Sequence, residues 1–281
     1  MMRIFSQRYK TLILLIGIIL VFFIGRTLLA AQFDVPRLFE LFDSLTILAS
    51  LFVILKSYHD LCSKDWIIAL ALGIFIGVSM LFTTLFSPYP LFGVVKTHSG
   101  QAIIRGFFTT IATLCGLIIM RQGGPVTFLH SEGKKNPWKN ILFGLAVGIP
   151  FSILNVFAFT LTESQNIVWQ NPLAAFLDAL QPGIVEEVIY RFALWGLLWL
   201  ILRKSLPTKA ATFAGLLIVF VHTYSHYDAL FIQAPLMGIG MGLVLGIVWG
   251  LPLYFLARHR GLESAIAFHW IQDALRFLTG F

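Results

Sequence analysis

An all-α, polytopic integral membrane fold with eight or nine transmembrane helices is predicted by composition, hydropathy and the spacing of apolar runs. Of the 281 residues, 58% are hydrophobic and only 12% are charged, whereas soluble domains carry about 25% charged residues. The mean hydropathy is +0.86. Apolar runs of about 20 residues, the length of a membrane-spanning helix, follow one another along the chain. Short segments with Gly, Pro, Lys and Arg separate them.

Nine apolar runs are candidates for membrane spans. They cover 11–31, 38–56, 66–87, 102–120, 139–161, 183–202, 209–226, 234–257 and 262–279. The second run carries Glu40 and Asp43, and the last run is short, so the expected number is eight or nine. The first run is longer than the apolar part of a signal peptide, and we expect it to remain as an uncut helix.

The loop charges predict the orientation of these spans. With the N-terminus inside, the inner segments hold fourteen Lys and Arg residues, and the outer segments hold only Arg37 and Lys96. Short cytoplasmic loops collect such residues, so a cytoplasmic N-terminus is expected. Because the basic residues behave as topology signals, the net charge of +7 does not indicate a nucleic-acid partner.

Most ionisable residues within apolar runs lie beyond residue 139. We therefore divide the chain into N-terminal transmembrane helices, 1–138, with about four spans, and a functional core, 139–281. Within the core, residues 168–180 are too short and mixed to span, and predict either a helix at the outer surface or a plain loop. Cys62 and Cys115 lack C-x-x-C spacing, so neither a disulfide framework nor a cysteine metal site is predicted.

Three ionisable residues interrupt the apolar segment QPGIVEEVIYRFAL, residues 181–194. A charge at bilayer depth costs at least ~2.5–3.5 kcal/mol, so such residues usually face a cavity or one another and serve chemistry or transport. Glu187 and Arg191 share a face of the helix predicted from 184 to 202, and this spacing predicts an ion pair. Glu186 is rotated by about 100° from Glu187. Glu186 is therefore the candidate general base, while a purely structural role is the alternative for the ion pair.

Two histidines four residues apart, His222 and His226, close the run at 209–226. A pair at this spacing resembles half of a zinc site, but the glutamate of H-E-x-x-H is missing. His226 lies at the edge of the loop, where an ordinary interfacial histidine is the simpler interpretation.

A third histidine, His269, shares a helical face with Asp273 in the last run. The carboxylate can orient the ring, and pairing of Asp273 with Arg276 is the structural alternative. At 1.5 Å per residue, Glu186, His222 and Asp273 fall in the outer half of a bilayer core of ~30 Å, and His269 falls close to its middle. The three segments are therefore expected to converge.

Together these residues resemble the motifs of the CAAX prenyl endopeptidase and bacteriocin-processing family of membrane proteases, also called CPBP or Abi. Glu186, Glu187 and Arg191 match E-E-x-x-x-R, and His269 with Asp273 matches H-x-x-x-N/D. The F-x-x-x-H motif is matched imperfectly by His222, because Ile218 stands in place of Phe; His226 fits it less well. The resemblance covers 139–281.

The resemblance implies an intramembrane endopeptidase that acts on a membrane-associated protein or peptide. Glu186 would activate water with the help of His222, and His269 with Asp273 would stabilise the oxyanion. An ionised aspartate cannot donate a hydrogen bond, so Asp273 must be protonated or must instead orient His269. The supporting residues would be Glu187, Arg191 and His226.

The resemblance also raises the choice between a glutamate protease and a zinc protease. A zinc site would use Glu186, His222 and His269 with an open position for water; the version without a metal is favoured. The expected partners are the lipid bilayer and a peptide or protein substrate, and the expected location is a bacterial cell membrane. The alternatives are a non-catalytic scaffold or bacteriocin-immunity protein of the same fold, and an ion- or proton-coupled transporter. The sequence has no inverted repeat, which counts against a transporter.

Overall fold

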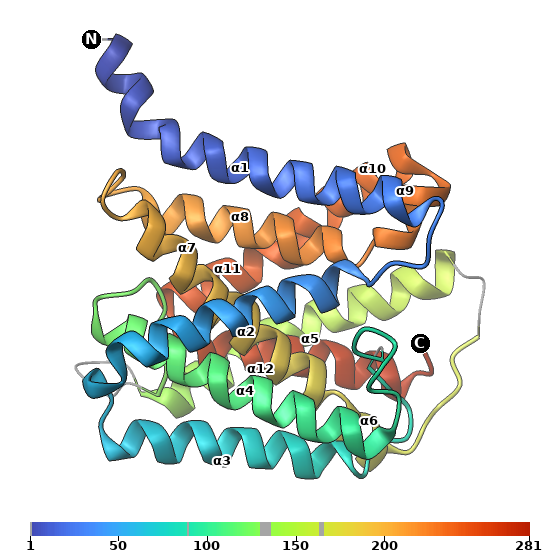
Figure 1. Ribbon diagram of the computed structural model, residues 1–281. Coiled ribbons are helices and arrows are strands. Elements are labelled where there is room, and N and C mark those ends of the chain that lie inside the picture. The colour runs from blue at the N-terminus through green and yellow to red at the C-terminus, as the bar shows by residue number, and fades with distance from the viewer. Residues whose placement is uncertain (1, 89, 130–135, 163–165) are drawn as a thin grey trace.

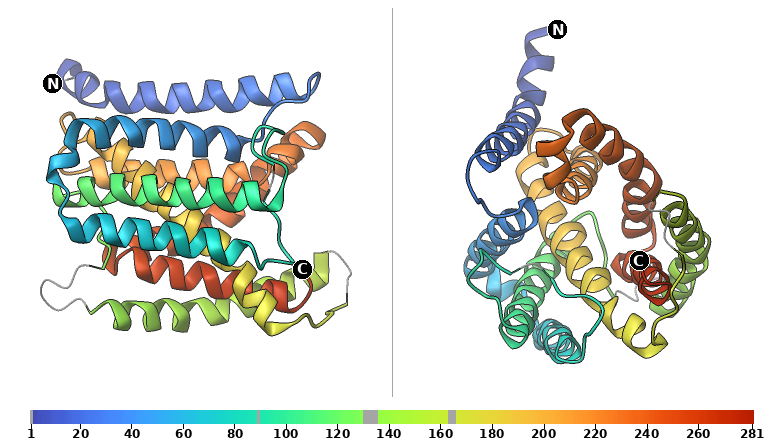
Figure 2. Two further views of the ribbon diagram at one scale, coloured as in Figure 1. Left: turned by 60° about the horizontal axis from the view of Figure 1, so that its bottom comes forward. Right: turned by 90° about the vertical axis from the view of Figure 1, so that its right-hand side faces the viewer.

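The computed structural model describes residues 2–88, 90–129, 136–162 and 166–281. Within these ranges the long helices lie side by side and alternate in direction, with the two termini at opposite ends (Figures 1 and 2). The β-type pairing in the described residues is a single bridge between Leu91 and Val95. The predicted all-α class is confirmed. Lys134 and Lys135, two of the inner loop residues counted above, lie outside the described residues.

The N-terminal half consists of four long helices. These are α1 (Met2–Ala30), α2 (Leu38–Ser57), α3 (Ser63–Met80) and α4 (His98–Arg121), with a 3₁₀ turn, η1 (Tyr58–Asp60), between α2 and α3. The side chain of Thr97 accepts a hydrogen bond from the N–H of Gly100 and caps α4. Gly73 and Gly106 bring α3 and α4 close together, since a Cβ on Gly73 would lie 2.6 Å from the Gly106 carbonyl oxygen. Small residues commonly allow such contact between membrane helices.

The C-terminal half is built around one central helix. It contains α5 (Pro137–Thr162), α6 (Pro172–Asp178), η2 (Gln181–Leu194), α7 (Trp195–Leu202), α8 (Ala210–Ser225), α9 (Asp228–Gln233), α10 (Pro235–Leu245), η3 (Gly246–Gly250), α11 (Leu251–His259) and α12 (Leu262–Leu278). η2 continues directly into α7. It packs against α2 and α4 on one side and against α12 on the other, as the end-on view in Figure 2 shows.

Six helices in the described residues are long and apolar enough to cross a bilayer. They are Tyr9–Ala30, Leu38–Asp60, Ser63–Met80, His98–Arg121, Pro137–Leu161 and Pro235–His259. The other three predicted spans fall short because α8 has 16 residues, α12 has 17, and the joined η2 and α7 contain three ionisable residues. The described residues thus contain six candidate spans of an integral membrane protein, and the expected eight or nine are not confirmed. The three helices that fall short are those that carry the candidate site residues.

The continuous helix predicted from 184 to 202 is present, but its first part, η2, is a π-helix of 14 residues. At its end the N–H of Trp195 bonds to the carbonyl of Tyr190, five residues earlier. π-winding is usually limited to one turn and often occurs at functional sites. The neighbouring helix α12 packs closely against its start, since a Cβ on Gly183 would lie 2.9 Å from the Cα of Trp270. Such contacts cannot be read from local sequence.

The segment before η2 joins the two halves of the molecule. Within 168–180 the helical alternative is confirmed by α6, which is capped by Asn171 through bonds from the N–H groups of Leu173 and Ala174. The buried carboxylate of Asp178 accepts hydrogen bonds from the backbone N–H groups of the loop that follows α3, namely Thr84, Leu85 and Phe86. This loop is therefore fixed close to the start of η2.

Candidate active site

Glu186 of η2 and His222 of α8 are in direct contact. The Oε2 atom of Glu186 lies 2.8 Å from Nε2 of His222, and the two side chains are 17% and 5% exposed. The imidazole of His222 is held in place by the Tyr190 ring, with centroids 4.6 Å apart, and by Phe39 of α2 at 5.7 Å. Between the two histidines that the sequence offered, the geometry selects His222 as the partner of Glu186.

Glu187, the next residue of η2, is fully enclosed. Its Oε1 atom lies 2.9 Å from Nη1 of Arg191 and 2.8 Å from Nδ1 of His269, and the side chains of Glu187 and Arg191 are 0% and 1% exposed. The predicted ion pair is confirmed, and it includes a histidine from α12 that the sequence did not place there. One carboxylate oxygen thus holds two partners from two helices.

His269 lies between two carboxylates. Besides the bond to Glu187, its Nε2 atom lies 3.3 Å from Oδ2 of Asp273, and Oδ1 of Asp273 lies 3.0 Å from Nη2 of Arg276. The orienting role and the ion pair, which the sequence left as alternatives for Asp273, are both present. Because an ionised carboxylate can only accept, the ring is suited to carry a proton on each nitrogen. His269 is therefore a positively charged donor in this arrangement.

His226 belongs to the same group of side chains. Its ring centroid lies 5.1 Å from that of His222 and 4.7 Å from that of Phe39. The centroids of His222 and His269 are 6.3 Å apart, so the predicted convergence of the three segments is present. His226 is exposed, but it borders the site instead of standing apart at the membrane interface.

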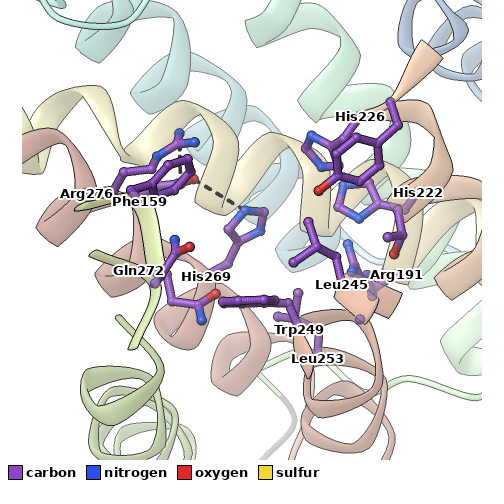
Figure 3. A pocket seen from close by; sticks show the side chains of 15 residues that line it. Phe159, Arg191, His222, His226, Leu245, Trp249, Leu253, His269, Gln272 and Arg276 are labelled. Carbon is purple, nitrogen blue, oxygen red and sulfur yellow. Dashed lines mark ion pairs between the residues drawn. The ribbon is translucent and has the colours of Figure 1, made fainter. Parts of the chain in front are cut away.

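Two cavities meet at this site. The first, of about 200 Å³, is lined by the apolar side chains of Phe159, Leu245, Trp249 and Leu253 together with the polar and charged side chains of the site. Figure 3 shows His222 and His226 on one side of this cavity, Gln272 and Arg276 on the other, and His269 between them. The second, of about 180 Å³, includes Glu186 and two charged residues of the N-terminal half. Both cavities border His226, His269, Asp273 and Arg276.

Residues 168–275 match the family model described as Type II CAAX prenyl endopeptidase Rce1-like. Over this segment the chain is similar to the CAAX protease family. The match covers less than half of the chain and includes every catalytic and supporting residue predicted from the sequence. At the level of the family, it supports a CAAX-type intramembrane protease. No curated protein and no solved structure matches the chain.

The sequence reasoning missed a charged pair that lies outside the segment matched by the CAAX protease model. Asp43 of α2 and Arg105 of α4 form an ion pair, with Oδ2 of Asp43 2.6 Å from Nη1 of Arg105. Both residues line the second cavity together with Glu186. A signal was present in the sequence, since each of these charged residues interrupts an apolar run near its beginning. The sequence could not show that the two runs are neighbours.

The zinc ligands that the family resemblance implied are not assembled as a set. Both ring nitrogens of His269 face carboxylates, Glu187 on one side and Asp273 on the other. Glu186, His222 and His226 instead bring one ligand atom each within 4.8 Å of one another. Two histidines and a glutamate are a donor set that suits zinc, so the chemistry of this second set fits the metal.

Proposed function

We propose that this protein is an intramembrane endopeptidase that hydrolyses a peptide bond in a membrane-associated protein or peptide, with Glu186 as the general base. The observation that carries the proposal is the contrast between the two adjacent carboxylates. Glu187 is sealed and neutralised by Arg191, whereas Glu186 borders a cavity and is held by His222. A base must reach both water and substrate, and only Glu186 has this access.

The reaction follows from these positions. Glu186 removes a proton from water while the oxygen forms a bond to the carbonyl carbon of the substrate. His222, bonded to the same carboxylate, fixes its orientation and assists this transfer. When the C–N bond breaks, the proton passes from Glu186 to the leaving amine nitrogen. The two cavities give the peptide room on both sides of the reacting carbon.

The oxyanion is stabilised by His269. Glu187 holds Nδ1 of the ring, and Asp273, itself paired with Arg276, sets the direction of Nε2. The Nε2 atom lies 3.3 Å from Oδ2 of Asp273, and its N–H is the donor that we assign to the developing negative charge. Fixed donors of this kind contribute most when they are preorganised. Asp273 thus serves as an orienting residue and need not donate a hydrogen bond itself.

We infer that the site opens toward the outer side of a bacterial cell membrane. The loop charges favour a cytoplasmic N-terminus, and the site lies at the end of the molecule where α1 ends, opposite the N-terminus in Figure 1. Substrates prenylated in the cytoplasm would lie on the other side. The proposed substrate is therefore a membrane protein or peptide without a required prenyl group.

The test is cleavage of a membrane-tethered peptide by the purified protein in lipid bilayers. We expect cleavage by the unaltered chain and none by the Glu186→Ala variant at equal protein level. Unchanged turnover in that variant would refute the proposal. Turnover in neither protein, with a cellular phenotype that survives Glu186→Ala, would favour the non-catalytic scaffold instead.

A zinc-dependent form of the same reaction is the second candidate, and the cluster of Glu186, His222 and His226 favours it. These three residues would hold the metal, which would supply a Lewis acid and a more acidic bound water. Elemental analysis of the purified protein and activity after exhaustive chelation separate the two forms. Activity that survives chelation in zinc-free protein leaves only the glutamate form.

A further inference from the structure

The second cavity is closed by side chains from both halves of the chain. α2 and α4 supply Asp43 and Arg105, whereas η2 supplies Gln181 and Glu186. Asp43 and Arg105 are 3% and 5% exposed. The N-terminal helices thus place a buried charged pair opposite the proposed general base, although they lie outside the segment that matches the family.

The pair has unused hydrogen-bonding capacity. Among the described residues, the guanidinium group of Arg105 bonds only to Asp43. Its Nε atom and Oε1 of Gln181 are buried without an aligned hydrogen-bond partner, whereas the carboxylate of Asp43 also meets the hydroxyl of Tyr190. Buried polar groups are normally paired, and arginine offers five donors. Two unsatisfied groups on residues that line the same cavity therefore indicate a polar ligand.

The ligand should be neutral and should both donate and accept. Asp43 and Arg105 neutralise each other, so a charged ligand group would disturb the pair. Arg105 offers donors, while Asp43 and Gln181 offer acceptors. A peptide backbone presents one N–H and one C=O at each residue and matches this combination, and an extended chain shows these groups every ~3.3–3.6 Å.

We propose that Asp43 and Arg105 form a subsite that binds the backbone of the substrate peptide on one side of the bond that is cleaved. The inference rests on the proposed function, because it assumes that a peptide lies along Glu186. The two cavities adjoin at His226 and His269. An extended peptide passes from the first cavity across Glu186 to Asp43 and Arg105. The N-terminal half is then part of the substrate site.

The experiment measures binding in the full-length Glu186→Gln protein in lipid nanodiscs, so that no cleavage occurs. The probe is a fluorescein-labelled peptide of unique sequence with about 20 apolar residues and a central Gly-Ser. A series of the same peptide carries one backbone N-methyl group at each successive position. Each N-methyl group removes one N–H donor.

The test variant adds Asp43→Asn with Arg105→Gln to this background, because a single change would leave a buried charge unpaired and would risk misfolding. The matched control changes Asp65→Asn with Arg121→Gln, which removes the α3–α4 ion pair of 2.7 Å that lies outside the second cavity. Both double variants lose one acidic and one basic residue, and both involve α4.

We expect the Asp43/Arg105 variant to bind the unmodified peptide about 10-fold more weakly, as is typical for lost hydrogen bonds to charged groups. At one position of the peptide, or at two adjacent ones, an N-methyl group should weaken binding about 10-fold in the parent and in the control. In the test variant the same N-methyl group should weaken binding less than about 2-fold. A merely structural pair would lower stability and leave the N-methyl profile unchanged. An identical profile in parent and test variant, or no peptide binding by the parent, would overturn the inference.

Cleavage by the chain with its native Glu186 separates this inference from the proposed function. Binding with the expected N-methyl pattern but without cleavage supports the subsite and contradicts the endopeptidase. If the chain cleaves the peptide but the N-methyl binding profile is the same with and without the Asp43/Arg105 pair, the result supports the endopeptidase and contradicts the subsite.

Discussion

The two sides of η2 carry neighbouring glutamates in opposite environments. On the side of α8, Glu186 is 17% exposed and bonds to His222. On the side of α12, Glu187 is 0% exposed and meets Arg191 and His269. The side chains are chemically the same, so the surrounding helices create the whole difference.

This difference separates reactivity from support. A carboxylate that is enclosed between two cations is stabilised in its charged form and cannot approach a substrate. A carboxylate at a cavity, with a single histidine partner, retains a lone pair for a proton. A change at Glu186 should therefore affect turnover, whereas a change at Glu187 should affect folding and, because Glu187 holds His269, turnover as well.

The largest effect is expected for Glu186→Gln. Removal of a general base lowers turnover by about 10²–10⁴-fold, and the partly exposed position should leave the free energy of unfolding within about 1 kcal/mol of the parent. Peptide cleavage and thermal unfolding in detergent measure the two quantities. Glu187→Gln is the matched control, and equal losses of folding stability in both variants would remove the contrast.

Arg191→Ala should act mainly on stability. The change leaves Glu187 buried without its arginine, and breaking a buried pair in this way costs about 3–5 kcal/mol. Chemical unfolding and expression level measure the loss. Arg276→Ala is the control on the more exposed pair, whose arginine is 28% exposed, and it should cost less than about 1 kcal/mol. Comparable losses would show that enclosure does not distinguish the pairs.

The two histidines of α8 should differ in turnover. His222→Ala removes the group bonded to Glu186 and should lower turnover about 100-fold, within the range for positioned acid–base groups. His226→Ala should lower it less than about 10-fold, because its ring does not contact Glu186 directly. Initial rates with one tethered peptide compare them. Equal losses, together with zinc in the purified protein, would indicate the metal form.

The smallest effect is expected for Asp273→Asn. The amide oxygen of the asparagine can still accept a hydrogen bond from His269, so turnover should fall no more than about 5-fold. Asp273→Ala removes the orienting group and should lower turnover about 10–100-fold, as does the loss of partners that orient a histidine in metal sites. The ratio of the two rates at fixed substrate is the measurement. A larger loss with Asn than with Ala would contradict an orienting role for Asp273.

The sequence predicted local relations well. Glu187 and Arg191 pair because they are four residues apart on one helix, and α6 begins at Asn171 and Pro172, which favour a helix start. Contacts between residues far apart in the chain were predicted only in part. Motif order and depth indicated that Glu186, His222 and His269 converge, but contact with His222 in preference to His226 required the packing of Phe39 and Tyr190.

By itself the sequence determined the helical membrane class, the apolar runs and the identity of the ionisable residues, because hydropathy and helical periodicity are local properties. Only the tertiary structure decided the π-winding of η2, the enclosure of Glu187 and the meeting of Asp43 with Glu186 at one cavity. The histidine partners of the two glutamates, His222 and His269, lie 36 and 82 residues away in the chain. Such contacts depend on how several helices pack at once, and no local pattern records that packing.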